Sequence, residues 1–236
     1  MDIRIDGVSH RYGGQTVLDD ISLDIPSGQI VCVIGPSGCG KSTTLRMIAG
    51  HEAVSDGTIV LDGNDISRKQ SAQRGTAMML QSYALFPHLS VADNVSFGLK
   101  VKGVAQETRL ARAAELLRLV DMEPLSERLP AQLSGGQQQR VAVARALFQQ
   151  AHSLLADEPI SAVDPARARS LITLLTEIAT ENQLTLVMSI HNVELAREFF
   201  PRIIGLKNGH ILFDSPEAST EQLEELYHLS ESELVE

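Results

Sequence analysis

Residues 35–42 have the types and spacing of a loop that binds a phosphate chain. The segment follows an apolar run over residues 30–34 and precedes a helical pattern over residues 43–50, the context in which this motif works. Its glycines allow backbone N–H groups to curl around an anion, and the positive end of the next helix favours negative charge. We expect Lys41 to contact the β- and γ-phosphates of a nucleoside triphosphate, and Ser42 to ligate Mg²⁺. The predicted binding residues are Gly35-Pro36-Ser37-Gly38-Cys39-Gly40-Lys41-Ser42 together with Thr43.

Two acidic residues follow a second apolar run, Ser153-Leu154-Leu155-Ala156. A carboxylate at the end of a buried strand can hold Mg²⁺ beside a phosphate-binding loop, which is the role expected of Asp157. The next residue, Glu158, is placed to orient or deprotonate an attacking water molecule. The alternative is that Glu158 only caps the turn before Pro159.

A third segment, which we call the signature segment, covers Leu133-Ser134-Gly135-Gly136-Gln137 and precedes a helix predicted over residues 138–149. A serine and two glycines before a helix make a second N-terminus suited to an anion. The alternative for such a serine–glycine pattern is an ordinary N-capped helix.

The elements that must position these residues are read from hydrophobic periodicity. Continuous apolar runs at residues 30–34, 153–156, 184–190 and 203–206 predict strands buried on both faces. Helical patterns separate them, which indicates a largely parallel α/β core. Short β-rich segments with glycine turns occupy the N-terminal part, and residues from about 90 to 150 are helical, with an apolar stripe from Leu110 to Val120. We expect the helical segment to be inserted into the α/β core.

Composition excludes several classes of protein. The 236 residues carry 20 Lys and Arg against 30 Asp and Glu, a net charge of −10, which argues against a nucleic-acid binder. Eight of the acids lie from Asp214 onwards, where there is no Lys or Arg. No apolar run reaches the length of a membrane span and the N-terminus lacks a secretory signal, so a cytoplasmic protein is expected. Two cysteines give no disulfide framework; Cys39 is expected to be a reactive thiol, because Lys41 and a helix N-terminus lie close to it.

The order of these motifs resembles that of ABC-transporter ATPases over the whole chain. The signature segment has the form characteristic of that family. The resemblance assigns Tyr12 to adenine stacking, and Gln81 and His191 to the γ-phosphate, with Gln81 also at Mg²⁺. It assigns Ser161-Ala162-Val163-Asp164 to a loop along a dimer seam. It implies a P-loop NTPase (RecA-like) core, an N-terminal antiparallel β subdomain and an inserted α-helical subdomain.

The resemblance also implies an assembly. Two copies form a head-to-tail homodimer in which the signature segment of one subunit closes over the nucleotide held by the other. Integral membrane permease subunits would bind this dimer at the cytoplasmic face of the inner membrane, and an extracytoplasmic solute-binding protein would act through them. The predicted layout is one ABC ATPase domain over residues 1–236. It has a core at 1–88 and 152–236, helices at about 89–151 and an acidic C-terminal helix or tail at 214–236.

The solute is predicted less directly, because two segments point to different subgroups. Residues 80–91 resemble importers of sugars, polyamines or iron. Residues 146–151 and 155–161, with Gln149-Gln150 and the run Ala156-Asp157-Glu158-Pro159-Ile160, resemble phosphonate importers. We favour a phosphonate or a related phosphorus oxyanion as the solute. An exporter or lipoprotein-release ATPase, and a soluble ABC ATPase acting on DNA or the ribosome, are the remaining alternatives.

Overall fold

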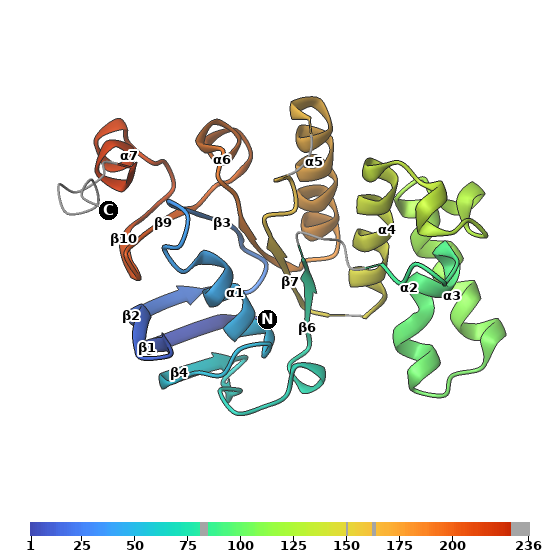
Figure 1. Ribbon diagram of the computed structural model, residues 1–236, viewed down its shortest axis with the longest axis horizontal. Helices are drawn as coiled ribbons and strands as arrows, with labels where there is room; N and C mark the ends of the chain where they lie inside the picture. Colours follow the sequence, from blue (N-terminus) through green and yellow to red (C-terminus); the bar gives the residue numbers. More distant parts are fainter. Residues whose placement is uncertain (81–84, 150, 162–163, 228–236) are drawn as a thin grey trace.

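The computed structural model describes residues 1–80, 85–149, 151–161 and 164–227, which form two β-sheets and a set of helices (Figure 1). The strands are β1 (Ile3–Tyr12), β2 (Gln15–Ile25), β3 (Ile30–Ile34), β4 (Asp56–Leu61), β5 (Asn64–Asp65), β6 (Thr76–Met79), β7 (Ser153–Asp157), β8 (Thr185–Ser189), β9 (Ile203–Lys207) and β10 (His210–Ser215). The α-helices are α1 (Lys41–Ala49), α2 (Val91–Val101), α3 (Gln106–Leu119), α4 (Gly135–Phe148), α5 (Pro165–Glu181), α6 (Val193–Phe199) and α7 (Thr220–Tyr227). Short 3₁₀ turns occur at Ser71–Gln73, Glu123–Leu125 and Pro130–Gln132.

A six-stranded sheet with the order β10-β9-β3-β8-β7-β6 forms the centre of the molecule. Its strands are parallel except β10, which pairs with β9 in the antiparallel sense at the edge. The four apolar runs predicted as buried strands are β3, β7, β8 and β9. The parallel core expected from the sequence is therefore confirmed.

Alternate residues of these strands pack into two different apolar cores, because successive side chains of a strand point to opposite faces. On β3, Val31 and Val33 join β1, β2, β4 and α1 in one core, whereas Cys32 and Ile34 join the core built with α2 to α6. Both faces of the sheet are thus covered. This explains why the central strands read as continuous apolar runs.

The second sheet has the order β2-β1-β4-β5 and is antiparallel throughout. It packs against α1 and one face of the central sheet. Figure 1 shows α2, α3 and α4 together at the end of the molecule away from this sheet, between β6 and β7 in sequence. The predicted domain boundaries at about residues 89 and 151 remain a prediction.

The starts of two helices differ from the prediction. Helix α1 begins at Lys41 rather than at residue 43, and α4 begins at Gly135 rather than at Gln138. The sequence pattern placed the glycines outside α4, but Ser134 caps this helix through the N–H of Gln137, so both glycines lie in its first turn. The acidic C-terminal segment begins inside β10 and includes α7. No helix within the described ranges combines the length and apolar character that crossing a membrane requires.

Arg74 is a buried cation that closes the C-terminal end of α1. Its guanidinium donates hydrogen bonds to the carbonyl oxygens of Met47 (2.5 Å), Ile48 (3.2 Å) and Lys69 (2.8 Å). Burial lowers the pKa of Arg74 from its ordinary value. The carbonyl end of a helix attracts positive charge, so this contact satisfies the last turn of the helix that follows the phosphate-binding loop.

We predict that Arg74→Met lowers the free energy of unfolding by about 2–4 kcal/mol, because several buried carbonyl groups lose their donor at once. Urea unfolding followed by circular dichroism measures the change. Arg4→Met, on an exposed position of β1, is the matched control and should shift stability by at most about 0.5 kcal/mol. Equal stability of the two variants would contradict a structural role for Arg74.

Candidate active site

The phosphate-binding loop connects the end of β3 to α1, and its backbone requires glycine at two positions. Gly35 has φ of 153°, and a Cβ atom there would lie 2.1 Å from the carbonyl oxygen of Leu206. Gly40 has φ of 106° at the N-cap of α1, and a Cβ atom there would lie 2.3 Å from Cδ2 of Leu18. Side chains at either position would collide with the core, so the loop can keep its curvature only with glycine.

Lys41 is the first residue of α1, and its side chain turns back to the base of this loop. Its ammonium donates hydrogen bonds to the carbonyl oxygens of Gly35 (2.8 Å) and Pro36 (3.0 Å). The residue is only 4% exposed. A buried positive charge therefore lies beside the N-terminus of a helix, an arrangement that attracts an anion.

Ser42 and Asp157 are 115 residues apart in sequence and meet at the carboxyl edge of the central sheet. The hydroxyl of Ser42 donates to Oδ1 of Asp157 at 2.7 Å, and the hydroxyl of Ser189 donates to the same oxygen at 3.0 Å. Parallel pairing places Asp157 opposite Ser189 at the ends of β7 and β8. The guanidinium of Arg46 lies 3.8 Å from Oδ2 of the carboxylate. Adjacent hydroxyl and carboxylate oxygens are the hard ligands that Mg²⁺ prefers, so these residues fit the predicted metal site.

Glu158 and His191 form a second pair at the same edge. Oε1 of Glu158 lies 2.5 Å from Nε2 of His191, and both residues line a cleft of about 220 Å³ with Ser161 and Asn192. Glu158 has φ of +47°, a conformation that is costly for a residue with a side chain. Its N–H donates to the hydroxyl (3.0 Å) and the carbonyl oxygen (3.2 Å) of Ser189, which hold the backbone in place.

Tyr12 ends β1 close to the start of α1 and is 44% exposed. Partial burial and then a hydrogen bond with Glu52 raise the pKa of Tyr12, while a hydrogen bond with Thr43 and the charge of Arg46 act in the opposite direction. The ring therefore stands next to the first turn of α1. This is where a base attached to loop-bound phosphates could stack.

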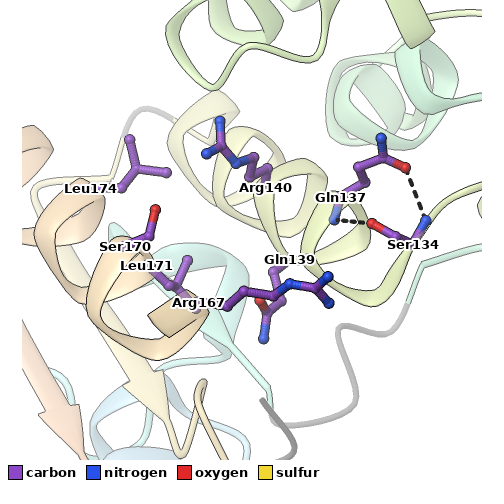
Figure 2. Close-up of a pocket in the computed structure, with 9 residues that line it drawn as sticks. Ser134, Gln137, Gln139, Arg140, Arg167, Ser170, Leu171 and Leu174 are labelled. Atoms are coloured by element: carbon purple, nitrogen blue, oxygen red, sulfur yellow. Dashed lines mark hydrogen bonds between the residues drawn. The ribbon is translucent and has the colours of Figure 1, made fainter. Parts of the chain in front are cut away.

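The signature segment lies at the N-terminus of α4, away from the phosphate-binding loop. Ser134 and Gln137 cap each other: the N–H of Gln137 donates to the Ser134 hydroxyl (3.3 Å), and the N–H of Ser134 donates to Oε1 of Gln137 (2.9 Å) (Figure 2). A cavity of about 210 Å³ beside them is lined by residues of the signature segment, α4 and α5, and neither Lys41 nor Ser42 is among them. Within one copy of the chain, this cavity therefore excludes the lysine and serine predicted to bind phosphate and Mg²⁺.

Asp164 is the N-cap of α5. Its carboxylate accepts a hydrogen bond from the N–H of Arg167 at 3.1 Å and pairs with the Arg167 guanidinium at 3.2 Å. Arg167 also packs over the signature segment, since a Cβ atom on Gly136 would lie 3.7 Å from its Cδ. Three predicted positions, Gln81, Ala162 and Val163, lie outside the described residues.

The expectation of a reactive Cys39 is wrong. Burial raises the pKa of its thiol above the ordinary value, and this outweighs the opposing effect of Lys41. The side chain is 3% exposed and packs with the core under the N-terminal sheet. Sequence proximity to a cation indicated a low pKa, but desolvation acts in the other direction and is larger.

Two residues of the site were not predicted. Ser189 joins Asp157 to the backbone of Glu158, and Arg46 faces the Asp157 carboxylate from α1. Ser189 stands two residues before His191 in the apolar run of β8, where it is the single hydroxyl after Thr185. A hydroxyl residue at the end of a buried strand, close to a predicted site histidine, could have indicated that Ser189 belongs to the site.

The comparisons with known proteins agree with this geometry. Residues 18–161 match the family described as ABC transporter. The chain is 42% identical over 210 residues to the Fe(3+) ions import ATP-binding protein FbpC of Escherichia coli (strain K12), covering 89% of this chain and 60% of that protein. It is 40% identical over 212 residues to the Spermidine/putrescine import ATP-binding protein PotA of Haemophilus ducreyi (strain 35000HP / ATCC 700724), covering 90% and 57%.

A solved structure gives the same result for the fold. The dimeric structure of a post-hydrolysis state of the ATP-binding cassette MJ0796, bound to ADP and Pi, matches with a TM-score of 0.80 and 32% identity, covering 90% of this chain and 97% of that one. The predicted fold class is confirmed.

This chain belongs to the ABC transporter family. It spans 60% of the length of the first of these curated relatives and 57% of the second. The relatives carry names of iron and polyamine import, which matches the alternative drawn from residues 80–91. The likeness to phosphonate importers is not shown by these comparisons.

Proposed function

We propose that this chain binds and hydrolyses ATP as the ATP-binding subunit of an importer. The observation that carries the proposal is the convergence of a phosphate-binding loop, two oxygen ligands and a carboxylate–imidazole pair at one edge of the central sheet. Lys41 and Ser42, Asp157 and Glu158, and His191 come from three separate segments of the chain. A purely structural ion pair between Glu158 and His191 would not explain why Glu158 keeps a costly backbone conformation with φ of +47°.

In this proposal the triphosphate lies on the loop of residues 35–43. Lys41 exchanges its contacts with the loop carbonyls for the β- and γ-phosphates, and the N-terminus of α1 adds its partial positive charge. Tyr12 stacks on the adenine. Ser42 and Asp157 would hold Mg²⁺, which when bound neutralises charge on the phosphates. Gln81 is proposed near the same ion on the basis of the family resemblance.

Hydrolysis needs a base and an orienting group next to the γ-phosphate. Glu158 accepts a proton from water as the water oxygen forms a bond to phosphorus and the bond to the β-phosphate oxygen breaks, giving ADP and phosphate. His191 holds the Glu158 carboxylate at 2.5 Å and can hydrogen-bond the γ-phosphate. The backbone bonds of Glu158 to Ser189 keep this carboxylate in place during the reaction.

The proposed active unit is a homodimer. The signature segment of one chain, with Ser134 and Gly135 exposed at the start of α4, has no lysine of its own. We therefore assign Ser134, Gly135, Gly136 and Gln137 to the ATP held by the other chain. Asp164 lies in the loop along this seam. The dimeric structure of MJ0796 supports the arrangement, because that protein is similar to this chain over nearly its whole length.

The proposed permease partner binds at a groove of about 370 Å³ between β6, α2 and α4. Phe86 and Phe97 line it with their ring centroids 4.4 Å apart, as expected for a surface that receives an apolar helix. Two neighbouring apolar residues do not contribute: Val91 is fully buried in the core, and Leu89 is not among the lining residues. The complex would place this chain on the cytoplasmic face of the membrane.

We predict that Glu158→Gln lowers ATP turnover about 10²- to 10⁴-fold while leaving ATP affinity within a few-fold, because the amide keeps the shape but removes the base. Phosphate release and equilibrium titration measure the two quantities, and size-exclusion chromatography with Mg-ATP should show a stable dimer. Glu177→Gln, exposed on α5, is the control. Normal turnover of Glu158→Gln would exclude it as the base.

We predict that two inactive variants restore activity when mixed. Lys41→Ala damages the phosphate site and Ser134→Arg damages the signature segment, so a mixed dimer has one site with both defects and one with neither. An equal mixture should recover about a quarter of wild-type turnover if dimers form at random and each site acts independently. A mixture as inactive as each variant alone would contradict a shared site.

The solute class proposed is iron or a polyamine, on the names of the relatives, with an extracytoplasmic solute-binding protein as the receptor. We predict that ATP turnover of the complex in lipid vesicles rises several-fold when this binding protein carries Fe³⁺ or spermidine. The same protein with a phosphonate is the comparison. Stimulation by the phosphonate alone would instead support the interpretation favoured from residues 146–151 and 155–161.

A further inference from the structure

His10 is a buried histidine that the proposed chemistry does not use. It lies on β1, is 6% exposed, and its ring contacts that of Tyr12 with centroids 4.5 Å apart and planes at 80°. Such a perpendicular contact sets the positive edge of one ring against the negative face of the other. Tyr12, in contrast, is exposed at the site where the base is proposed to stack.

The local backbone places these two rings together. Residues two apart in a strand point to the same face, and the pairing of β1 with β2 shifts register on both sides of His10. Such irregularities re-aim side chains at the ends of sheets. Nδ1 of His10 lies 3.5 Å from the hydroxyl of Ser55, in the connection from α1 to β4, which holds the other side of the ring.

The second ring nitrogen has no ordinary partner. Nε2 of His10 is buried and makes no hydrogen bond among the residues that the structure describes. An unpaired buried nitrogen is costly, and such groups need an explanation. The Tyr12 ring is the aromatic surface next to this histidine, and an N–H group directed at an aromatic face gains a weak hydrogen bond.

We propose that His10 is a positioning residue for nucleotide recognition: it holds the Tyr12 ring at the angle that adenine stacking requires. The inference rests on the proposed function, in which Tyr12 contacts the base. The Tyr12 side chain also hydrogen-bonds Glu52 and Thr43. The contact with His10 adds a restraint on the plane of the ring, and fixing this plane beforehand lowers the entropic cost of stacking. His10 therefore affects affinity for the base and not for the phosphates.

The test compares ATP with inorganic tripolyphosphate, which keeps the phosphates and lacks the base. Calorimetric titrations in EDTA, where hydrolysis does not proceed, give both dissociation constants for wild type, His10→Leu, His10→Phe and Tyr12→Ala. His10→Leu should weaken ATP binding about two- to tenfold and leave tripolyphosphate binding unchanged. His10→Phe keeps an aromatic edge against Tyr12 and should restore ATP affinity to within about twofold of wild type.

A double variant separates positioning from general support of the fold. If His10 acts through Tyr12, adding His10→Leu to Tyr12→Ala should cause no further loss of ATP affinity. His210→Leu, an exposed histidine on β10, is the control and should bind both ligands as wild type does. Equal weakening of ATP and tripolyphosphate, an additive loss in the double variant, or unchanged ATP binding would each overturn the proposal.

The same data distinguish this inference from the proposed function. If Tyr12→Ala leaves the ratio of the two affinities unchanged, adenine does not stack on Tyr12 and that part of the proposed function fails together with the inference. If Tyr12→Ala lowers ATP affinity alone and His10→Leu does not, only the role of His10 is excluded. Urea unfolding of each variant verifies that the compared proteins are folded.

Discussion

The hydrogen bond between Ser42 and Asp157 joins the two halves of the site, and the parallel pairing of the central strands makes it possible. Because β3, β8 and β7 run in the same direction, the loop after β3 and the acids at the end of β7 lie at the same edge of the sheet. Ser189 of the intervening β8 contacts Asp157 through its side chain and Glu158 through both its hydroxyl and its carbonyl. A change of register in the pairing of β3 with β8, or of β8 with β7, would move Ser42 away from Asp157 and Glu158.

The site also depends on where positive charge is buried. The chain is acidic overall, yet Lys41 lies at the N-terminus of α1 and Arg74 at its C-terminal end, so one short helix has a buried cation at each end. The two have different consequences. Arg74 complements the negative end of the helix and is satisfied by carbonyl groups, whereas Lys41 adds to the positive end and therefore favours an anionic ligand. Arg74 therefore stabilises the C-terminal end of α1, and Lys41 makes its N-terminal end suitable for binding phosphate.

The signature segment shows why one copy of the chain is incomplete as an ATPase in the proposed function. Ser134 and Gln137 satisfy each other across the first turn of α4, and the cavity beside them is formed with α5. Lys41, which would hold the phosphates, does not line this cavity. A second copy would supply what each lacks, and the loss of the γ-phosphate would remove the charge that joins them.

The sequence by itself determined β3, β7, β8 and β9 as buried strands, the phosphate-binding loop and the acids at the end of β7, because apolar runs and glycine spacing are local properties. It did not give the order of the strands in the sheet, which depends on how distant segments pair. It did not determine the state of Cys39, where burial outweighs the neighbouring lysine, or the start of α4, where a cap extends the helix over two glycines. Only the tertiary structure decided that Ser189 and Arg46 contact Asp157 and that the ring of His10 contacts that of Tyr12. Those contacts join residues from separate strands and helices, and their distances depend on how the elements pack together.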